Sequence, residues 1–163
     1  EAAGPAATLK IVVGVLILLF AFPSGYLADR IGRKMHLGLS GVMAAIGTVI
    51  LLLSPSLTVI MIGGSIVGAA IGMFFTTNWA LGTDIVPKKE AGKFLGISNL
   101  AGAGAGAVGA YIGGPIADYF TGNFPQIPGL GYMLIFAIYG ALFLVSSIVL
   151  IKVKEQMKIS STI

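Results

Sequence analysis

The glycines from Gly104 to Gly109 have the spacing G-x-G-x-x-G that, in dinucleotide-binding proteins, lets the backbone approach a pyrophosphate. That chemistry requires a β-strand before the glycines and a helix that begins at them. Here the glycines lie inside Phe94–Ala117, which is one uncharged apolar stretch. A phosphate-binding loop is therefore excluded, and the glycines require another explanation.

Other groups that perform covalent or metal chemistry are scarce. The chain has no cysteine, which removes thiolate ligands and thiol nucleophiles, and its one histidine, His36, belongs to a basic cluster. We expect His36 to contact lipid headgroups rather than a metal. The sequence has no Walker A motif, and its apolar stretches lack the Ser–His or paired-Asp groups of an intramembrane hydrolase. We therefore expect no enzyme activity, no cofactor and no metal.

The composition is that of a membrane protein. Of the residues 56% are hydrophobic and 10% charged, against about 25% charged in a soluble domain. Five uncharged stretches reach the roughly 18 apolar residues of a spanning helix. They are Ile11–Ala28, Leu37–Ser54, Leu57–Thr83, Phe94–Ala117 and Gly131–Ile151. The sequence predicts an all-α polytopic membrane protein with spans at about 9–28, 36–54, 57–83, 94–118 and 131–152.

The basic residues set the orientation of these spans. Nine of the ten lie in three clusters at alternate span ends, namely Arg30/Arg33/Lys34, Lys88/Lys89/Lys93 and Lys152/Lys154/Lys158. Basic residues stay on the cytoplasmic side during insertion, so we expect a cytoplasmic C-terminus with a tail at 155–163, in a multi-pass protein of the plasma membrane. The net charge of +4 then indicates contact with anionic lipids rather than with nucleic acid.

The glycines recur at helical spacing within the spans. Three sets lie four residues apart: Gly64/Gly68/Gly72, Gly102/Gly106 and Gly109/Gly113. Small residues at this spacing let two membrane helices approach closely and gain van der Waals contact. We interpret these sets as helix-packing surfaces, which either only pack or also slide and bend between conformations.

The stretch GYLADRIGRK (Gly25–Lys34) joins the first two spans. Its glycines permit close approach and a tight turn, and its basic residues are expected to meet lipid phosphates. The pattern resembles the cytoplasmic signature loop of the major facilitator superfamily, which lies between the second and third helices and is repeated between the eighth and ninth. The residues that match are Gly25, Asp29, Arg30, Gly32, Arg33 and Lys34.

The rest of the chain resembles the region around the second copy of this loop, the copy between the eighth and ninth helices. Residues 1–154 resemble helices eight to twelve, five helices of the C-terminal six-helix bundle of a twelve-helix transporter. The Asp84, Pro87 and Lys93 region is similar to the connection between the tenth and eleventh helices. The opening EAAGPAAT resembles the end of an outside loop. The resemblance implies that the N-terminal half of the same protein is missing from this chain.

The resemblance also implies roles for particular residues. Asp84 would pair with an arginine of the signature loop and close an inner gate, a contact worth about 1 kcal/mol at the headgroup boundary. Four residues are candidates for the solute path: Thr76, Asn78, Trp79 and Tyr111. Alternatives remain for some of these. Trp79 suits an interfacial belt, Asn78 could bond a neighbouring helix, Tyr111 could pack, and Ser98 and Asn99 suit hydrogen bonds at a helix start.

The function implied is secondary transport of a small solute by alternating access. Weak similarity in the span that contains Gly102 favours a sugar–cation symporter, coupled to protons or sodium, whereas Gly113–Pro115 also resembles a motif of drug or metabolite–proton efflux antiporters. A membrane interaction module without transport is the remaining alternative. Because the five uncharged stretches carry no Asp, Glu, Lys, Arg or His, a coupling group is expected in the missing half.

Overall fold

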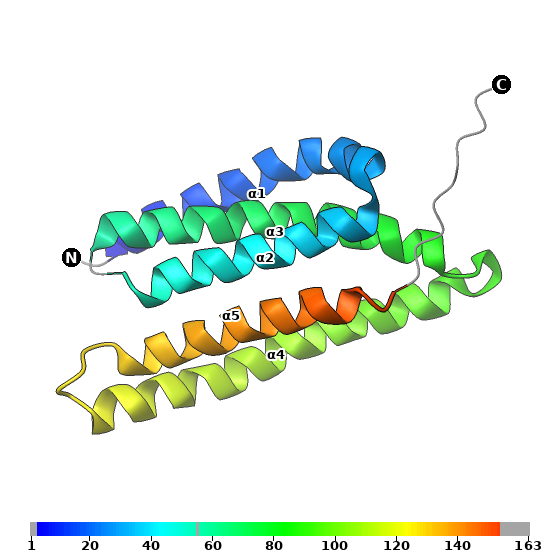
Figure 1. Ribbon diagram of the computed structural model, residues 1–163. Coiled ribbons are helices and arrows are strands. Elements are labelled where there is room, and N and C mark those ends of the chain that lie inside the picture. Colours follow the sequence, from blue (N-terminus) through cyan, green and yellow to red (C-terminus); the bar gives the residue numbers. More distant parts are fainter. Residues whose placement is uncertain (1–2, 55, 154–163) are drawn as a thin grey trace.

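The computed structural model describes residues 3–54 and 56–153 (Figure 1). The described backbone forms five α-helices and one short 3₁₀ helix, and it contains no strand. The elements are α1 (Ala3–Ile31), α2 (Arg33–Leu52), α3 (Leu57–Ile85), η1 (Lys88–Glu90), α4 (Ala91–Asn123) and α5 (Leu130–Leu150). All five α-helices are long and apolar enough to cross a membrane. The predicted all-α class with five spans is confirmed.

Helices α1 and α4 extend furthest beyond the predicted spans. α1 begins at Ala3 and α4 continues to Asn123. The expectation that the first residues end a loop is therefore wrong from Ala3 onward. Alanine has the highest helix propensity, and proline is tolerated in a first turn, where Pro5 lies. The predicted tail at 155–163, with Lys158, lies outside the described residues.

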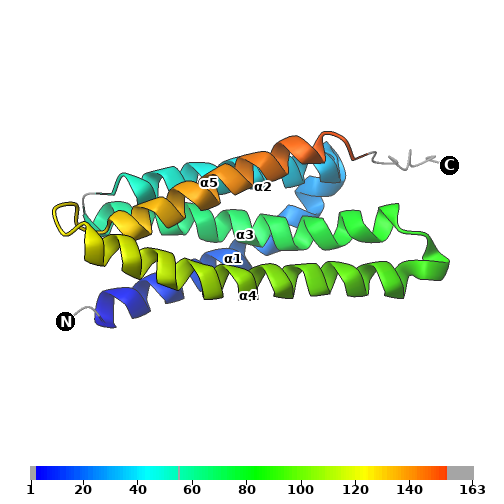
Figure 2. The same ribbon diagram turned by 90° about the horizontal axis from the view of Figure 1, so that it is seen from below.

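The described members of the three predicted basic clusters, which from the third include Lys152 alone, map to one end of the bundle. The α1–α2 connection, the α3–α4 connection and the last turn of α5 meet there, at the right of Figure 1, and we call it the basic end. The opposite end holds the start of α1 and the α2–α3 and α4–α5 connections. Figure 2 shows the same alternation from below.

Helices α1 and α3 run parallel and pack through glycines. Gly64, Gly68 and Gly72 lie against Leu9, Val13 and Ile17, which have the same four-residue spacing. A Cβ added to Gly68 would lie 3.0 Å from the carbonyl oxygen of Val13, and one added to Gly72 would collide with the carbonyl group of Ile17. We call this contact the α1–α3 seam. It brings the two backbones close enough for extensive van der Waals contact.

Helix α2 packs on α3 and α5 through small residues that the spacing argument did not select. Gly47 faces the carbonyl oxygen of Gly63 on α3, which lies 3.0 Å from the position of an added Cβ. On the other side, Gly41 lies against Ser147 of α5, and Gly140 of α5 lies against Thr48. The small residues of the α2–α3 contact and those of the α2–α5 contact do not repeat every four residues along one helix. The sequence pattern therefore did not reveal these two contacts.

Helix α4 is packed more sparsely. It contacts α5 and makes few contacts with α3, among them Leu95 of α4 against Gly82 of α3. Gly109 and Gly113 face the hydroxyl group of Tyr139 on α5, but a Cβ added to Gly102 or Gly106 would meet no described atom within 4 Å. The packing role expected for Gly102 and Gly106 therefore has no partner in the described chain and stays a prediction.

Replacing Gly72 by alanine should destabilise the protein, because the added Cβ would meet the rigid backbone of Ile17. We expect Gly72→Ala to lower the free energy of unfolding by about 1–3 kcal/mol, the usual cost of overpacking. The measurement is the thermal unfolding midpoint in detergent. Gly14→Ala is the matched control, since its Cβ meets no described atom within 4 Å. Equal losses in both variants would contradict the α1–α3 seam.

Candidate functional site

The connection between α1 and α2 is a single residue, Gly32. Its φ angle is 95°, a conformation that strains any residue with a side chain. Its carbonyl oxygen accepts a hydrogen bond from the backbone N–H of His36, so α2 starts at once. This sharp turn places the last residues of α1 beside the first residues of α2, which brings Asp29 within reach of Arg33.

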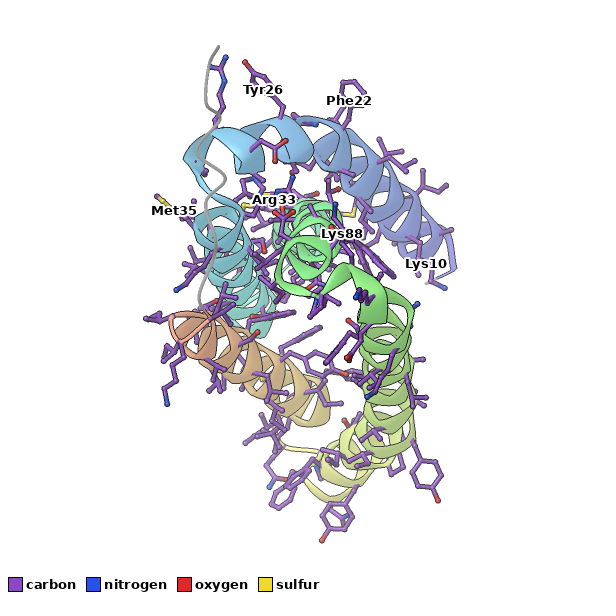
Figure 3. The ribbon with its side chains drawn as sticks, turned by 90° about the vertical axis from the view of Figure 1, so that its right-hand side faces the viewer. Lys10, Phe22, Tyr26, Arg33, Met35 and Lys88 are labelled. Atoms are coloured by element: carbon purple, nitrogen blue, oxygen red, sulfur yellow. The ribbon has the colours of Figure 1, made fainter. Side chains whose placement is uncertain are left out.

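Arg33 joins three helices at the basic end. Its Nε donates to Oδ1 of Asp29 on α1 at 3.0 Å, and its Nη1 donates to Oδ2 of Asp84 on α3 at 2.7 Å. The same Nη1 donates to the carbonyl oxygen of Ala80 on α3 at 2.8 Å. Figure 3 shows Arg33 pointing inward beside α3, whereas Phe22 and Tyr26 point outward. We call Arg33, Asp29 and Asp84 the Arg33 cluster.

The strength of the Arg33 cluster follows from its exposure. The side chain of Arg33 is 26% exposed, that of Asp84 33% and that of Asp29 60%. Water and salt screen such pairs, so each contributes about 1 kcal/mol at most, although the planar guanidinium suits two carboxylates well. The cluster can therefore hold the ends of α1, α2 and α3 together and still be broken by a modest change elsewhere.

The three basic residues of the signature loop differ in their surroundings. Arg30 lies over the ring of Tyr26, 4.4 Å from its centroid, and both are exposed, which suits contact with lipid headgroups. Lys34 instead donates from Nζ to the carbonyl oxygens of Ile151 and Val153 beyond α5, at 2.6 and 2.7 Å. The expectation of lipid contact fits Arg30, whereas Arg33 and Lys34 bond to the protein.

His36 is buried, so the expectation that it contacts headgroups is wrong. Its exposed fraction is 0%, and its Nδ1 lies 2.9 Å from Oγ1 of Thr77 on α3. Its Nε2 has no hydrogen-bond partner among the described residues. His36 lies three residues after Arg33, so both point to α3 from the same face of α2. The pair adds a second polar link between α2 and α3.

A cavity of about 640 Å³ with both polar and apolar lining residues lies between α3 and α4. It is lined by Phe74, Phe75, Asn78 and Trp79 of α3 and by Ser98, Asn99, Gly102 and Ala103 of α4. Two carboxamides and one hydroxyl offer donors and acceptors beside aromatic faces, which is the chemistry that binds hydroxylated solutes. We call it the amide pocket. Asn78 and Trp79 are candidates for the solute path from the sequence, whereas for Ser98 and Asn99 the sequence favours hydrogen bonds at a helix start.

Two other candidates for the solute path lie elsewhere. Thr76 donates from Oγ1 to the carbonyl oxygens of Ala21 and Gly72, both at 3.2 Å, so it faces α1. Its methyl group lies against Gly25 of the signature loop. Tyr111 is 84% exposed and lines a separate groove on α4. The structure does not bring these two residues to the amide pocket.

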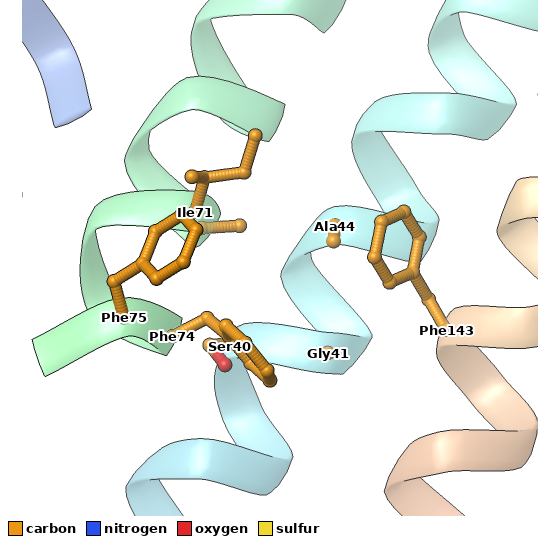
Figure 4. A pocket seen from close by; sticks show the side chains of 8 residues that line it. Ser40, Gly41, Ala44, Ile71, Phe74, Phe75 and Phe143 are labelled. Atoms are coloured by element: carbon orange, nitrogen blue, oxygen red, sulfur yellow. The ribbon is translucent and has the colours of Figure 1, made fainter. Parts of the chain in front are cut away.

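A second, apolar cavity lies behind the amide pocket. It measures about 230 Å³ and is enclosed by α2, α3 and α5 (Figure 4). Phe74 and Phe75 line both cavities, and Phe143 of α5 closes the far side of the apolar one. Two aromatic rings therefore separate a polar space from an apolar one. No single sequence stretch signals this cavity, because three helices build it.

Comparison with known proteins decides the family. The sequence profile of the Major Facilitator Superfamily matches residues 4–161, nearly the whole chain. The chain belongs to the major facilitator superfamily. The family prediction from the signature loop is confirmed, and the protein is an integral, multi-pass membrane protein. No solved structure gives a significant match to the chain.

Several superfamily members of known name are similar to the chain. The minor myo-inositol transporter IolF of Bacillus subtilis is 32% identical over 54% of the chain and 20% of its own length. The human facilitated glucose transporter member 12 of solute carrier family 2 is 28% identical over 80% of the chain and 21% of its own length. A triacylglyceride transporter of Mycobacteroides abscessus is 38% identical over 53% of the chain and 17% of its own length. The chain thus spans about a fifth of these relatives.

The contact between Arg33 and Asp84 should show as a coupling energy between α2 and α3. We expect a double-mutant cycle of Arg33→Gln and Asp84→Asn to give about 0.5–1 kcal/mol in the free energy of unfolding, because either single change already removes the ion pair. The cycle of Arg33→Gln with Asp118→Asn is the control, since Asp118 lies near the far end of α4. Additive effects in the first cycle would show that the pair does not form.

Proposed function

We propose that this chain forms part of a secondary transporter that moves a small polyhydroxylated solute, a sugar or cyclitol, by alternating access. The observation that supports this most is the amide pocket, which combines two carboxamides with an indole and phenyl rings. Such a lining can hydrogen-bond hydroxyl groups and pack against the apolar face of a sugar ring. Relatives that are named as inositol and glucose transporters support the same solute class.

In the proposed cycle the Arg33 cluster closes the basic end while the solute site opens to the other side. The positive-inside rule supports a cytoplasmic basic end, with the chain in the plasma membrane and its C-terminus inside. Contacts of about 1 kcal/mol suit this role, because a ligand shifts a conformational equilibrium only by its difference in affinity for the two states. Parts of the transporter outside this chain would form the other wall of the path.

We further propose that transport of the solute is coupled to a proton or a sodium ion. The five apolar stretches carry no acidic or basic side chain, so a proton or sodium site for symport would lie in a part of the protein outside this chain. A second candidate is export of an apolar drug or metabolite in exchange for protons. The apolar cavity and the similarity to the triacylglyceride transporter favour that alternative.

Loss of an amide from the pocket should weaken solute binding. We expect Asn78→Leu in the full-length transporter to raise the KM for a hexose or myo-inositol about tenfold, the value of one or two neutral hydrogen bonds. The measurement is initial uptake of labelled solute into proteoliposomes. Asn123→Leu is the matched control, because Asn123 bonds the backbone of Tyr119 at the opposite end. An unchanged KM for Asn78→Leu would remove this pocket from the solute path.

Neutralising Asp29 should impair the transport cycle without preventing membrane insertion. We expect Asp29→Asn to lower the rate of solute flux, because one of the two carboxylates that hold the guanidinium of Arg33 loses its charge. Flux per inserted molecule is measured in proteoliposomes, with Asp118→Asn as a control for loss of a carboxylate elsewhere. Unchanged flux in Asp29→Asn would count heavily against a gate at the basic end.

A further inference from the structure

Arg33 and Lys34 are neighbours in the first turn of α2, but their side chains diverge. Arg33 reaches α1 and α3, whereas Lys34 reaches the carbonyl oxygens of Ile151 and Val153 after α5. The last carbonyl groups of a helix lack partners within the helix and carry its negative dipole end. The ammonium group of Lys34 therefore caps the end of α5 from a different helix.

Two cations in the first turn of a helix are unfavourable in isolation, because that end carries the positive pole of the dipole. The turn also lacks a side-chain cap, since Gly32 precedes it, and no acidic residue lies within it. The position of this turn therefore depends on the partners that Arg33 and Lys34 find on other helices. One anchor lies on the α1 and α3 side, and the other lies on the α5 side.

Helix α5 can act as a fixed support for this turn. It packs along α2 through Gly41 and Ser147, and Ser147 donates from Oγ to the carbonyl oxygen of Gly38 at 3.3 Å. Further along, Gly140 lies against Thr48. Because α5 is held along this length, its capped end gives Lys34 a partner that is itself packed on α2.

We propose that Lys34 is a positioning residue of the gate: by capping α5 it holds the first turn of α2 so that Arg33 reaches Asp29 and Asp84 together. The proposal rests on the proposed function, since it assigns Lys34 a part in the same alternating-access cycle. Lys34 touches no solute in this role. Its loss leaves the chemistry of the Arg33 cluster intact but removes the support that orients it, which favours the state that is open at the basic end.

The test measures access from the basic end rather than transport. In the reconstituted full-length transporter, with other cysteines replaced, a cysteine at Ala103 in the amide pocket is labelled by an impermeant maleimide applied at the basic side. We expect Lys34→Met to raise the labelling rate about fivefold, the factor that corresponds to roughly 1 kcal/mol. Lys34→Arg, which keeps a cation and several donors, should restore the original rate within about twofold.

Two comparisons separate a positioning role from a general structural one. Lys89→Met, which removes an exposed cation of the same end, should leave labelling unchanged. In an Asp84→Asn background, Lys34→Met should add little, because the contact it supports is already lost. Equal increases in both backgrounds, or no increase at all, would overturn the proposal. If Lys34→Met does not insert, Lys34→Gln provides the same comparison.

The labelling experiment needs no solute, so it can fail separately from the proposed function. Labelling that depends on Lys34 as expected, together with no uptake of sugars or cyclitols, would retain the positioning role and reject the solute class. If these solutes are taken up but the labelling rate does not change in the Lys34 variants, the solute class is retained and the positioning role is rejected.

Discussion

The guanidinium of Arg33 is the contact on which the basic end of the bundle depends. It satisfies carboxylates of α1 and α3 and a backbone carbonyl of α3 from the first turn of α2. A lysine offers a single point charge and would not span these acceptors in one plane. The cluster remains partly exposed, so its net free energy stays small. A contact of this kind gives the three helix ends a defined arrangement without making that arrangement irreversible.

The rest of the structure divides into a closely packed part and a sparsely packed part. Helices α1, α2, α3 and α5 meet through glycines and small hydroxyl residues, where an added methyl group would strike a neighbouring backbone or side chain. Helix α4 makes few contacts with α3, and the amide pocket lies between these two helices. Contact area is therefore concentrated away from the pocket. This distribution lets the pocket change shape at a smaller cost than the seams between the other helices.

Much of the fold could be predicted from the sequence, because long uncharged stretches have few alternatives to spanning helices. The row of Gly64, Gly68 and Gly72 also indicated one contact surface, since its repeat is local to one helix. The sequence indicated only the α3 side of the amide pocket. Asn99 of α4 lines the same pocket as Asn78 through tertiary packing, which no local sequence pattern encodes. His36 was misplaced for a similar reason: its charged neighbours suggested the surface, whereas its position on the helix turns it toward Thr77.

The parallel pairing of α1 with α3 has a consequence for biosynthesis. Helices that are adjacent in sequence insert into the bilayer in order, so α1 enters the lipid before the glycines that it will contact have been translated. During that interval the side chains that will face these glycines lack their partners, and the mean hydropathy of 2.3 for this span is compatible with a lipid surrounding. Asp29, at the basic end of α1, likewise has no arginine partner until α2 has been made. Assembly of this part of the protein is thus delayed until the third helix arrives, and a translational pause between α2 and α3 would prolong the exposure of the first.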